Sequence, residues 1–320
     1  MIAAILKENF SEWSPGLSQQ RYYHYQWWQY SLPWAKRHLS YWAYASDDKP
    51  LASCKLYDLV MRHRSCNYRI AGIGAVFTPE RLRGSGLGLK LLESMIDLCR
   101  QRGYDALMLN SDIDTAYYNK VGFTTLGHRN FALELSEEYV KKWTKQLDQR
   151  FSSGRDEFSK IKDVTLQDVP TMVRHHTRWL ARRAYGFCRS EDYWHFKLSR
   201  EQHLHRHSNL AWPKQEIIAL NFEQHNGGYA LFEQGARSIR ILEIIGDEET
   251  QQSLWAQMLA LALRRKIYHL RGWEGSAPTE LKGVVTAERQ WSRPMILPLN
   301  PALHNWLDTK PCPLIELDHY

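Results

Sequence analysis

The chain has 320 residues, 43% of them hydrophobic, which is enough to form the cores of two domains. No apolar stretch approaches the roughly 18 residues of a membrane span, and Met1–Phe10 lacks the features of a secretory leader. The five scattered cysteines show no paired spacing, so we expect reduced thiols and a cytoplasmic protein. The net charge of +7 comes from dispersed basic residues with no long Lys/Arg run, so we expect no nucleic-acid partner.

The first part of the chain predicts a helix followed by neighbouring strands. Ser18–Tyr30 is typical of a helix and is rich in tyrosine and tryptophan. Ser40–Ala45 and Leu51–Arg62 have the composition of strands and are separated by a polar turn that contains Pro50. Cys66–Thr78, which ends in small and apolar residues, predicts a buried strand.

A basic, glycine-rich turn follows that strand. Gly84, Gly86 and Gly88 carry no side chains, so backbone N–H groups can approach an anion there. Arg81 and Arg83 add positive charge. Apolar residues then recur at helical spacing, and the amino end of this helix directs its positive dipole at the same point. The turn therefore predicts a phosphate-binding loop.

The next elements separate this loop from other phosphate-binding loops. Gly103 ends the helix, Tyr104–Leu109 predicts another strand, and a short helix carries Tyr118. A Walker loop is excluded because no Gly-Lys-Ser/Thr closes the turn. A dinucleotide-binding fold would need an acidic residue about 20 positions further on and would leave the following Tyr and Gly-Phe without a role.

This ordered set resembles the GNAT family of acyl-CoA-dependent N-acetyltransferases. One family pattern is Arg or Gln, two residues, Gly, one residue, and Gly or Ala, and Arg81, Gly84 and Gly86 match it. A second is a tyrosine four residues before Gly-Phe, matched by Tyr118 and Gly122–Phe123. The resemblance is close over about 60 residues and weaker on both sides.

The resemblance implies acetyl-CoA as co-substrate and no metal. The end of the strand would hydrogen-bond the pantetheine arm, with a free N–H of Val76 or Phe77 polarising the thioester carbonyl, and the turn would hold the pyrophosphate. Coenzyme A is anionic, which gives the basic composition a sufficient explanation. The residues implied in cofactor binding are Val76, Phe77, Thr78, Arg81, Arg83, Gly84, Ser85, Gly86, Leu87, Gly88 and Leu89.

The resemblance also implies the acid that protonates the leaving thiolate. Tyr118 is the candidate, packing in the core is its alternative role, and Tyr117 is the second choice. The base that deprotonates the acceptor amine is left open, because the strand Cys66–Phe77 has no carboxylate. Asp112 and Asp114 are candidates, although Asp112 can equally cap the short helix. The missing carboxylate favours a less basic acceptor amine or a base that acts through water.

The acceptor site is expected near an aromatic run over residues 22–34. Trp27 and Trp28 could hold a cationic amine by cation–π contact, and the alternative is packing in a core or between domains. His203 and His207 would share one helix face, but no carboxylate or cysteine completes a metal site there.

The chain divides into a catalytic domain at 1–136, a charged helical connector at 137–163 and a second domain at 164–320. The second domain repeats the order of strands, long helix, strand, short helix and final strand, with the last strand at Arg293–Leu299. Its turn at Ile245–Glu249 has acids where the first turn has arginines, which would repel a pyrophosphate. We therefore expect two tandem GNAT-like domains of α/β class, each a mixed, mostly antiparallel sheet flanked by helices. The second has lost acyl-CoA binding, and this architecture is similar to that of the enhanced-intracellular-survival acetyltransferases.

The implied function is N-acetyl transfer from acetyl-CoA to a primary amine of a small molecule or amino acid, by direct attack. One alternative is a protein or peptide N-acetyltransferase, in which the second domain docks a macromolecule. The other is an acyl-CoA-binding sensor without catalysis. The sequence indicates neither the acceptor nor the oligomeric state.

Overall fold

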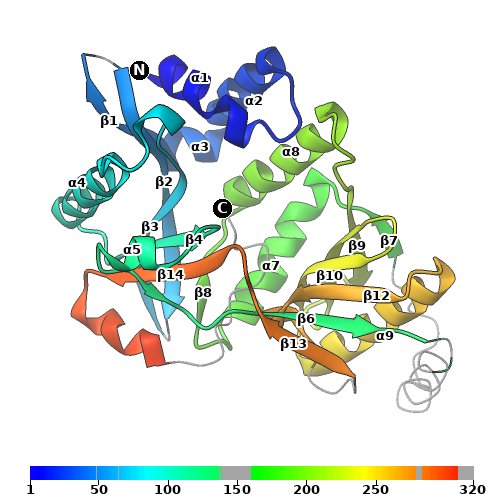
Figure 1. Cartoon of the computed structure of the whole chain (residues 1–320). Coiled ribbons are helices and arrows are strands. Elements are labelled where there is room, and N and C mark those ends of the chain that lie inside the picture. Colours follow the sequence, from blue (N-terminus) through cyan, green and yellow to red (C-terminus); the bar gives the residue numbers. More distant parts are fainter. Residues whose placement is uncertain (48, 64, 137, 139–159, 279–282, 309–320) are drawn as a thin grey trace.

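The computed structural model of the chain describes residues 1–47, 49–63, 65–136, 138, 160–278 and 283–308. In these residues two sheets lie side by side, and helices cover each of them (Figure 1). Each sheet has seven strands, and in each sheet one pair of neighbours is parallel while the others are antiparallel. The predicted fold class, α/β with two mixed sheets flanked by helices, is confirmed.

The first sheet, sheet A, is formed around long strands of the N-terminal half. Its order is β1-β2-β3-β4-β14-β5, with β8 paired to the end of β2. Neighbouring β3 and β4 are parallel. The strands are β1 (Leu39–Ser46), β2 (Lys49–His63), β3 (Cys66–Phe77), β4 (Ala106–Ser111), β5 (Thr124–Thr125), β8 (Tyr185–Phe187) and β14 (Arg293–Pro298).

Helices cover both faces of sheet A, and β2 is therefore buried on both sides. Helix α4 (Leu87–Gln101) packs its apolar side on one face, against Cys54 and Leu56 of β2. The alternate residues of β2 point to the other face, where Tyr57 and Leu59 pack against helices. The helices on that face are α1 (Ile2–Trp13), α2 (Gln19–Ser31) and α3 (Pro33–His38).

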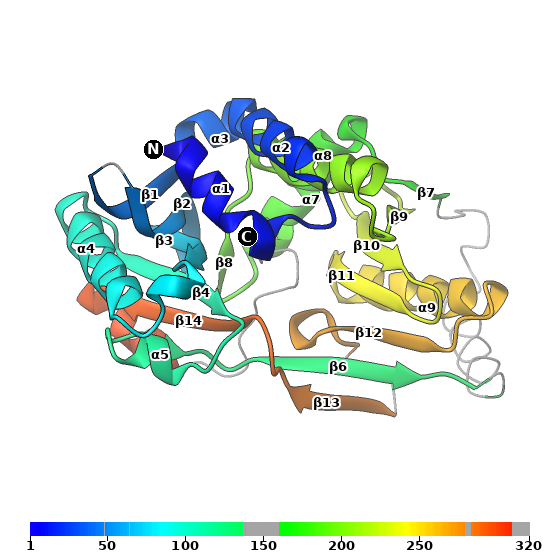
Figure 2. The same cartoon turned by 45° about the horizontal axis from the view of Figure 1, so that its top comes forward.

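The second sheet, sheet B, has the order β13-β6-β12-β11-β10-β9-β7. Helix α9 (Glu248–Arg264) packs on one face, and α7 (Val169–Leu180) and α8 (Glu191–His207) pack on the other (Figure 2). Helix α8 also contacts α2 and α3, so it lies between the two halves. The strands are β6 (Arg129–Glu134), β7 (Lys160–Asp163), β9 (Gln215–Leu220), β10 (Gly228–Gln234), β11 (Ile239–Ile245), β12 (His269–Trp273) and β13 (Val284–Glu288).

The two halves exchange strands. Strand β14, from the end of the chain, lies between β4 and β5 of sheet A, and β6 lies between β12 and β13 of sheet B. The expectation that the strand at Arg293–Leu299 completes the sheet of the second domain is therefore wrong. Burial explains the exchange, because Met295 and Ile296 are fully buried in the cores of sheet A and Phe131 and Leu133 are buried in that of sheet B. Short apolar strands of this kind do not specify their partners locally.

The predicted domain limits at 136 and 164 stay a prediction, and the exchanged strands cross them. Residues 139–159 of the predicted connector lie outside the described residues. The end of the connector, Lys160–Asp163, is strand β7 at the edge of sheet B, where it pairs with β9.

Candidate acyl-CoA site

Strands β3 and β4 separate near the end of β3, where the sequence predicted the acetyl-CoA site. Their parallel pairing runs from Ile70 and Ala106 to Ile73 and Leu109, and β3 continues beyond it through Gly74–Phe77. The backbone of that last segment is therefore unpaired on the side of β4 within the described residues. An extended ligand could add to it as a further strand.

A bulge in β3 marks the same point. Ser53 of β2 pairs with Phe77, but Lys55 pairs with Gly74, so β3 has one residue more than β2 between the two pairs. Ala75 takes up the extra length with a positive φ of 48°. The bulge takes Ala75 and Val76 out of the regular ladder, and Val76 is one of the two predicted donors to a thioester carbonyl.

The amino end of α4 is open. Gly86 is its N-cap with φ 80°, and no side chain caps the helix. Gly84 also has φ 80°, and a Cβ atom on either glycine would meet no protein atom within 4 Å. The first N–H groups of α4 therefore point into open space, where they and the helix dipole favour an anion.

The corresponding helix of the second half is closed by its own residues. Asp247 is the N-cap of α9, and its carboxylate accepts a hydrogen bond from the Thr250 N–H at 2.9 Å. Burial opposes its ionisation, but the hydrogen bonds from Thr250 and the nearby arginines hold the pKa of Asp247 below its ordinary value. A Cβ atom on Gly246 would lie 2.6 Å from Thr250 Cγ2. This amino end is occupied by a carboxylate, which supports the prediction that acyl-CoA binds in the first half alone.

Two acids of α1 pair with the two arginines of the loop. Arg81 donates to both carboxylate oxygens of Glu8 at 2.9 Å, and Arg83 donates to Glu12 at 2.7 Å. Arg83 also donates to the Thr78 carbonyl at 3.1 Å. The hydrogen bond from Arg81 is the main cause that lowers the pKa of Glu8. Glu8 and Glu12 are one turn apart, so one face of α1 neutralises the charge that was predicted to hold phosphate.

Replacing both Glu8 and Glu12 by glutamine should tighten acetyl-CoA binding by about three- to tenfold at low ionic strength. The two carboxylates compete with the pyrophosphate for the arginines and repel it. Calorimetric titration measures the effect, and the gain should shrink at high salt because these groups are partly exposed. Glu93→Gln, an exposed acid on α4, is the matched control. Weaker binding by the double variant would mean instead that α1 positions the arginines for the cofactor.

The rest of the loop folds against itself. Ser85 Oγ donates to the Leu82 carbonyl at 2.5 Å. Gly88 is buried, and a Cβ atom there would lie 2.3 Å from Tyr117 Oη and 3.2 Å from Thr78 Oγ1. Leu87 and Leu89 lie in the first turn of α4 and are partly buried. The glycine at 88 is thus required by close packing with the short helix that carries the tyrosines.

The two tyrosines of α5 (Ala116–Asn119) have different surroundings. Tyr118 is buried, packs edge-on against Phe123, and makes no hydrogen bond through its hydroxyl within the described residues. Burial raises the pKa of Tyr118 well above its ordinary value, so the phenol keeps its proton. Tyr117 is partly buried, and its hydroxyl lies over Gly88 at the start of α4. The structure places Tyr117 beside the glycine-rich loop and Tyr118 in the core under α4, and which of them acts as the acid stays a prediction.

The two acids before α5 hold the backbone. Asp112 accepts a hydrogen bond from the Ser292 N–H at 2.8 Å, which ties the β4–α5 loop to the turn before β14. Asp114 accepts from the Ala116 N–H at 3.0 Å and so supports the first turn of α5. Both residues are exposed. The contact of Asp112 is with the other half of the chain, whereas the sequence suggested a cap of the short helix.

The aromatic run over residues 22–34, in α2 and α3, is mostly buried. Tyr22, Tyr25 and Trp34 are at most 5% exposed. Trp28 stacks on His203 of α8 with ring centroids 4.6 Å apart, whereas Trp27 is 49% exposed. Burial, with help from neighbouring cationic groups, lowers the pKa of His203 to about 4, so a neutral ring takes part in this stack. Binding of the acceptor by Trp27 and Trp28 stays a prediction.

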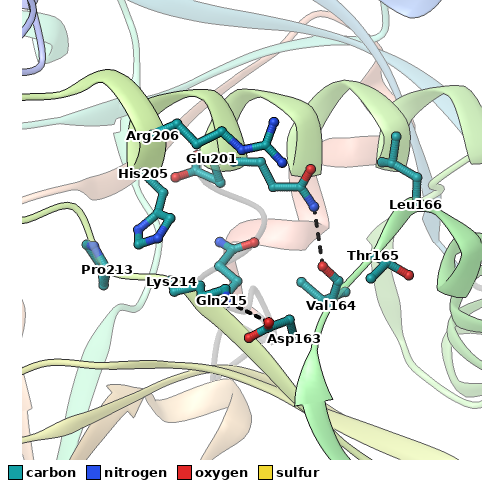
Figure 3. A pocket seen from close by; sticks show the side chains of 11 residues that line it. Asp163, Val164, Thr165, Leu166, Glu201, His205, Arg206, Pro213, Lys214 and Gln215 are labelled. Carbon is teal, nitrogen blue, oxygen red and sulfur yellow. Dashed lines mark hydrogen bonds and ion pairs between the residues drawn. The ribbon is translucent and has the colours of Figure 1, made fainter.

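A cavity of about 390 Å³ lies between α8, sheet B and the turn before β14. Its lining includes Trp291, which is next to the Ser292 that Asp112 holds. A second cavity, of about 350 Å³, shares Glu201, Pro213 and Gln215 with the first. Figure 3 shows this second cavity, with His205 and Arg206 of α8 above the strand that carries Gln215. The first cavity is linked to the β4–α5 loop through Trp291, since the next residue, Ser292, donates its N–H to Asp112.

Two negative observations apply to the part of the chain that the structure describes. No group of three or more histidine, cysteine, aspartate or glutamate residues is placed to hold a metal ion there. His203 lies instead among the rings of His24, Tyr25 and Trp28. None of the described helices is long and apolar enough to cross a membrane.

Sequence reasoning missed a buried polar cluster beneath α2. Lys55 of β2, 9% exposed, donates to Gln26 Oε1 at 3.0 Å, and Tyr41 donates to the same oxygen at 2.8 Å. The signal was present, because Ser53 and Lys55 are polar residues in an otherwise apolar strand. Only the packing of α2 and α8 against that face shows that they are buried.

Comparisons with known proteins agree with this geometry. Residues 2–123 match the family model described as "Acetyltransferase (GNAT) family". No curated protein matches the sequence significantly.

Solved structures resemble nearly the whole chain. A GCN5-related N-acetyltransferase from Kribbella flavida has a TM-score of 0.62 at 16% identity and covers 93% of this chain and 69% of its own. A probable N-acyltransferase of unknown function from Enterococcus faecalis has a TM-score of 0.65 at 13% identity, with 93% and 70% covered. Eis1 from Mycobacterium abscessus has a TM-score of 0.56 at 12% identity, with 88% and 72% covered. At these identities the likeness shows the fold alone.

Proposed function

Because its first 123 residues contain a domain of the acetyltransferase (GNAT) family, we propose that this protein transfers an acetyl group from acetyl-CoA to a primary amine. The acceptor would be a small molecule or an amino acid, and its nitrogen would attack the thioester directly. The observation that supports this most is the junction of two open features: the unpaired end of β3 and the uncapped amino end of α4.

The two features fit the two parts of coenzyme A. The backbone of Gly74–Phe77 can hydrogen-bond the pantetheine arm, and N–H groups at Val76 or Phe77 can polarise the thioester carbonyl. The N–H groups around Gly84 and Gly86 can bind the pyrophosphate, with Arg81 and Arg83 beside them once Glu8 and Glu12 release them. No side chain has to move to uncover the amino end of α4, since a Cβ on either glycine meets nothing.

Tyr118 is proposed to protonate the leaving thiolate, with Tyr117 as the second candidate. A phenol can donate a proton in this role only while it is neutral, and the burial that raises the pKa of both tyrosines favours that form. Asp112 is the acid among the predicted site residues, and its hydrogen bond to Ser292 gives it a role in holding the loop.

A small acceptor is favoured by the cavity between α8, sheet B and Trp291. Its volume of about 390 Å³ is within the usual range for small-molecule sites. The lining carries both signs of charge, with Glu201 and Glu233 against Lys197 and Arg240. Such a site suits an ammonium compound with a second polar or anionic group better than an extended, uniformly charged polymer.

The test is an acceptor panel with detection of free thiol. Purified protein is incubated with acetyl-CoA and with amino acids, polyamines, aminoglycosides and lysine-containing peptides in separate reactions. Thiol release that depends on a small amine, with the acetylated amine found by mass spectrometry, supports the proposal. Release only with peptides favours a protein acetyltransferase. Tight calorimetric binding of acetyl-CoA without any transfer favours a sensor, and absence of binding rejects all three.

A further inference from the structure

The face of sheet A that is opposite α4 carries a lysine beside the expected thioester. Lys55 and Gly74 are paired in register, so both residues present the same face of the sheet. Gly72 of β3 is paired with Tyr57 and presents that face too. Gly72 is buried and Gly74 half-buried, so β3 presents no side chain on this face beside Lys55, at the place where β3 separates from β4.

Lys55 is buried without an acidic partner. Its residue is 9% exposed, and its amine contacts Gln26 Oε1 at 3.0 Å and the Tyr41 ring at 5.2 Å. No carboxylate of the described residues forms an ion pair with it. A buried ammonium normally requires such a partner, so the site favours the neutral amine.

The groups around Lys55 also lack an anion at contact distance. Burial, followed by the charge of Arg200 on α8, lowers the pKa of Lys55 to about 7. Glu201 on α8 interacts with Arg200 and Tyr25 rather than with Lys55. The titratable groups that face this cluster from β1, β2, α2 and α8 are Tyr41, Tyr57, Tyr22, Tyr25, Arg200 and Glu201.

One acceptor atom in the cluster is unused. Gln29, 1% exposed, donates through its amide nitrogen to Gln26, but its Oε1 accepts no hydrogen bond within the described residues. A buried acceptor without a partner is costly, and an N–H group of a bound amine would satisfy it. The cluster therefore offers an amine one hydrogen-bond acceptor and one neutral base.

We propose that Lys55 is the general base of the transfer and takes a proton from the acceptor ammonium as the acceptor binds beside Gly74 at the end of β3. This rests on the proposed acetyl transfer and supplies the base that β3 lacks. No carboxylate is needed for this step, because an amine that is neutral near pH 7 can accept the proton.

The protons balance as follows. The acceptor ammonium gives one proton to the Lys55 nitrogen, and its free electron pair forms the C–N bond with the thioester carbonyl carbon. The C–S bond then breaks, and the thiolate takes a proton from the tyrosine. The nitrogen loses its second proton as the amide forms, which restores the tyrosine, and Lys55 returns the first proton to solvent.

The first test is the pH dependence of kcat/KM for the wild type and two variants. Wild-type activity should rise with pH and level off above about 7, because the neutral form of Lys55 is the active one. Lys55→Arg keeps a positive charge that does not dissociate, and Lys55→Met keeps the length of the side chain. Both should lose about 100-fold or more in kcat at pH 7.5 and lose the inflection near 7, with acetyl-CoA affinity unchanged.

The controls separate catalysis from folding and from simple binding. Lys36→Arg, an exposed change on α3, should keep full activity. Thermal unfolding and calorimetric binding of acetyl-CoA check that each variant is folded. An active Lys55→Arg variant, or a Lys55→Met variant that raises only the KM of the acceptor, would overturn the proposal and make Lys55 an anchor for a carboxylate.

A second measurement does not depend on activity. In protein labelled with ¹³C at the lysine Cε, the signal that disappears in Lys55→Met should titrate near 7, whereas exposed lysines titrate near about 10.4. Titration of Lys55 near 10 would overturn its role as base even in an active enzyme. If the wild type acetylates no amine but Lys55 titrates near 7, the proposed function fails while the neutral buried lysine stands.

Discussion

Replacing Gly86 by valine should reduce acetyl-CoA affinity by at least about 100-fold. The side chain would project into the open space before α4, where a Cβ atom meets nothing within 4 Å, and would keep the pyrophosphate away from the helix N–H groups. Loss of two charge-assisted hydrogen bonds, each worth about 1.5–3 kcal/mol, accounts for this factor. Calorimetric titration with acetyl-CoA measures it.

Gly103 provides a matched control at the other end of the same helix. It has φ 70°, against 80° for Gly86, and a Cβ atom there also meets nothing within 4 Å. Gly103→Val should therefore carry a similar backbone strain and a similar loss of stability, but should bind acetyl-CoA normally. Equal loss of binding in the two variants would mean that strain, and not obstruction of the site, is the cause. Normal binding by Gly86→Val would remove the loop from the cofactor site.

Tyr118→Phe should lower kcat by about 100-fold and change acetyl-CoA affinity by less than about threefold. The hydroxyl makes no hydrogen bond within the described residues, so its removal breaks no protein contact. The raised pKa keeps the phenol protonated at neutral and mildly alkaline pH, so this group should cause no loss of activity as the pH rises through 9. Single-turnover kinetics with a saturating acceptor measure the chemical step.

A variant of the neighbouring Tyr117 tests which of the two tyrosines of α5 protonates the thiolate. Tyr117→Phe removes a hydroxyl that lies over Gly88, so we expect a change in acetyl-CoA affinity larger than the change in kcat. The reverse pattern in the two variants would move the acid from Tyr118 to Tyr117. Full kcat in both would leave the thiolate to be protonated by water.

The conformation of the glycine-rich loop and the helix after it could be predicted because their determinants are local. The spacing of Arg81, Gly84 and Gly86, the apolar stripe of α4 and the Tyr118 that precedes Gly-Phe all lie within one short segment of the sequence. The positive φ values at both glycines follow from the absence of a Cβ atom. Helix α2 and strands β1 and β2 were predicted for the same reason, since their periodicity and turns are local.

The rest depends on residues that are distant in the sequence. Nothing near Arg81 indicates that Glu8 of α1 would neutralise it. In the sequence Lys55 is one polar residue of a strand. It is buried because α2 and the Arg200 of α8 pack on the same face of the sheet. The aromatic run of α2 predicted a binding surface, but most of its rings fill the contact with α8. Such contacts are set by packing between elements and leave no local pattern.

The exchange of strands also constrains the order in which the chain can fold during synthesis. Strand β4 ends at Ser111, but its neighbour β14 is complete only at Pro298, which at about 5–20 residues per second is a delay of roughly 10–40 s. During this time one edge of β4 is unpaired on the ribosome-bound chain. Strand β6 is also unpaired until β12 and β13 have been synthesised. Unpaired edges recruit other chains. Newly made protein is thus most prone to aggregate just before release, and chaperones that shield strand edges should raise its yield.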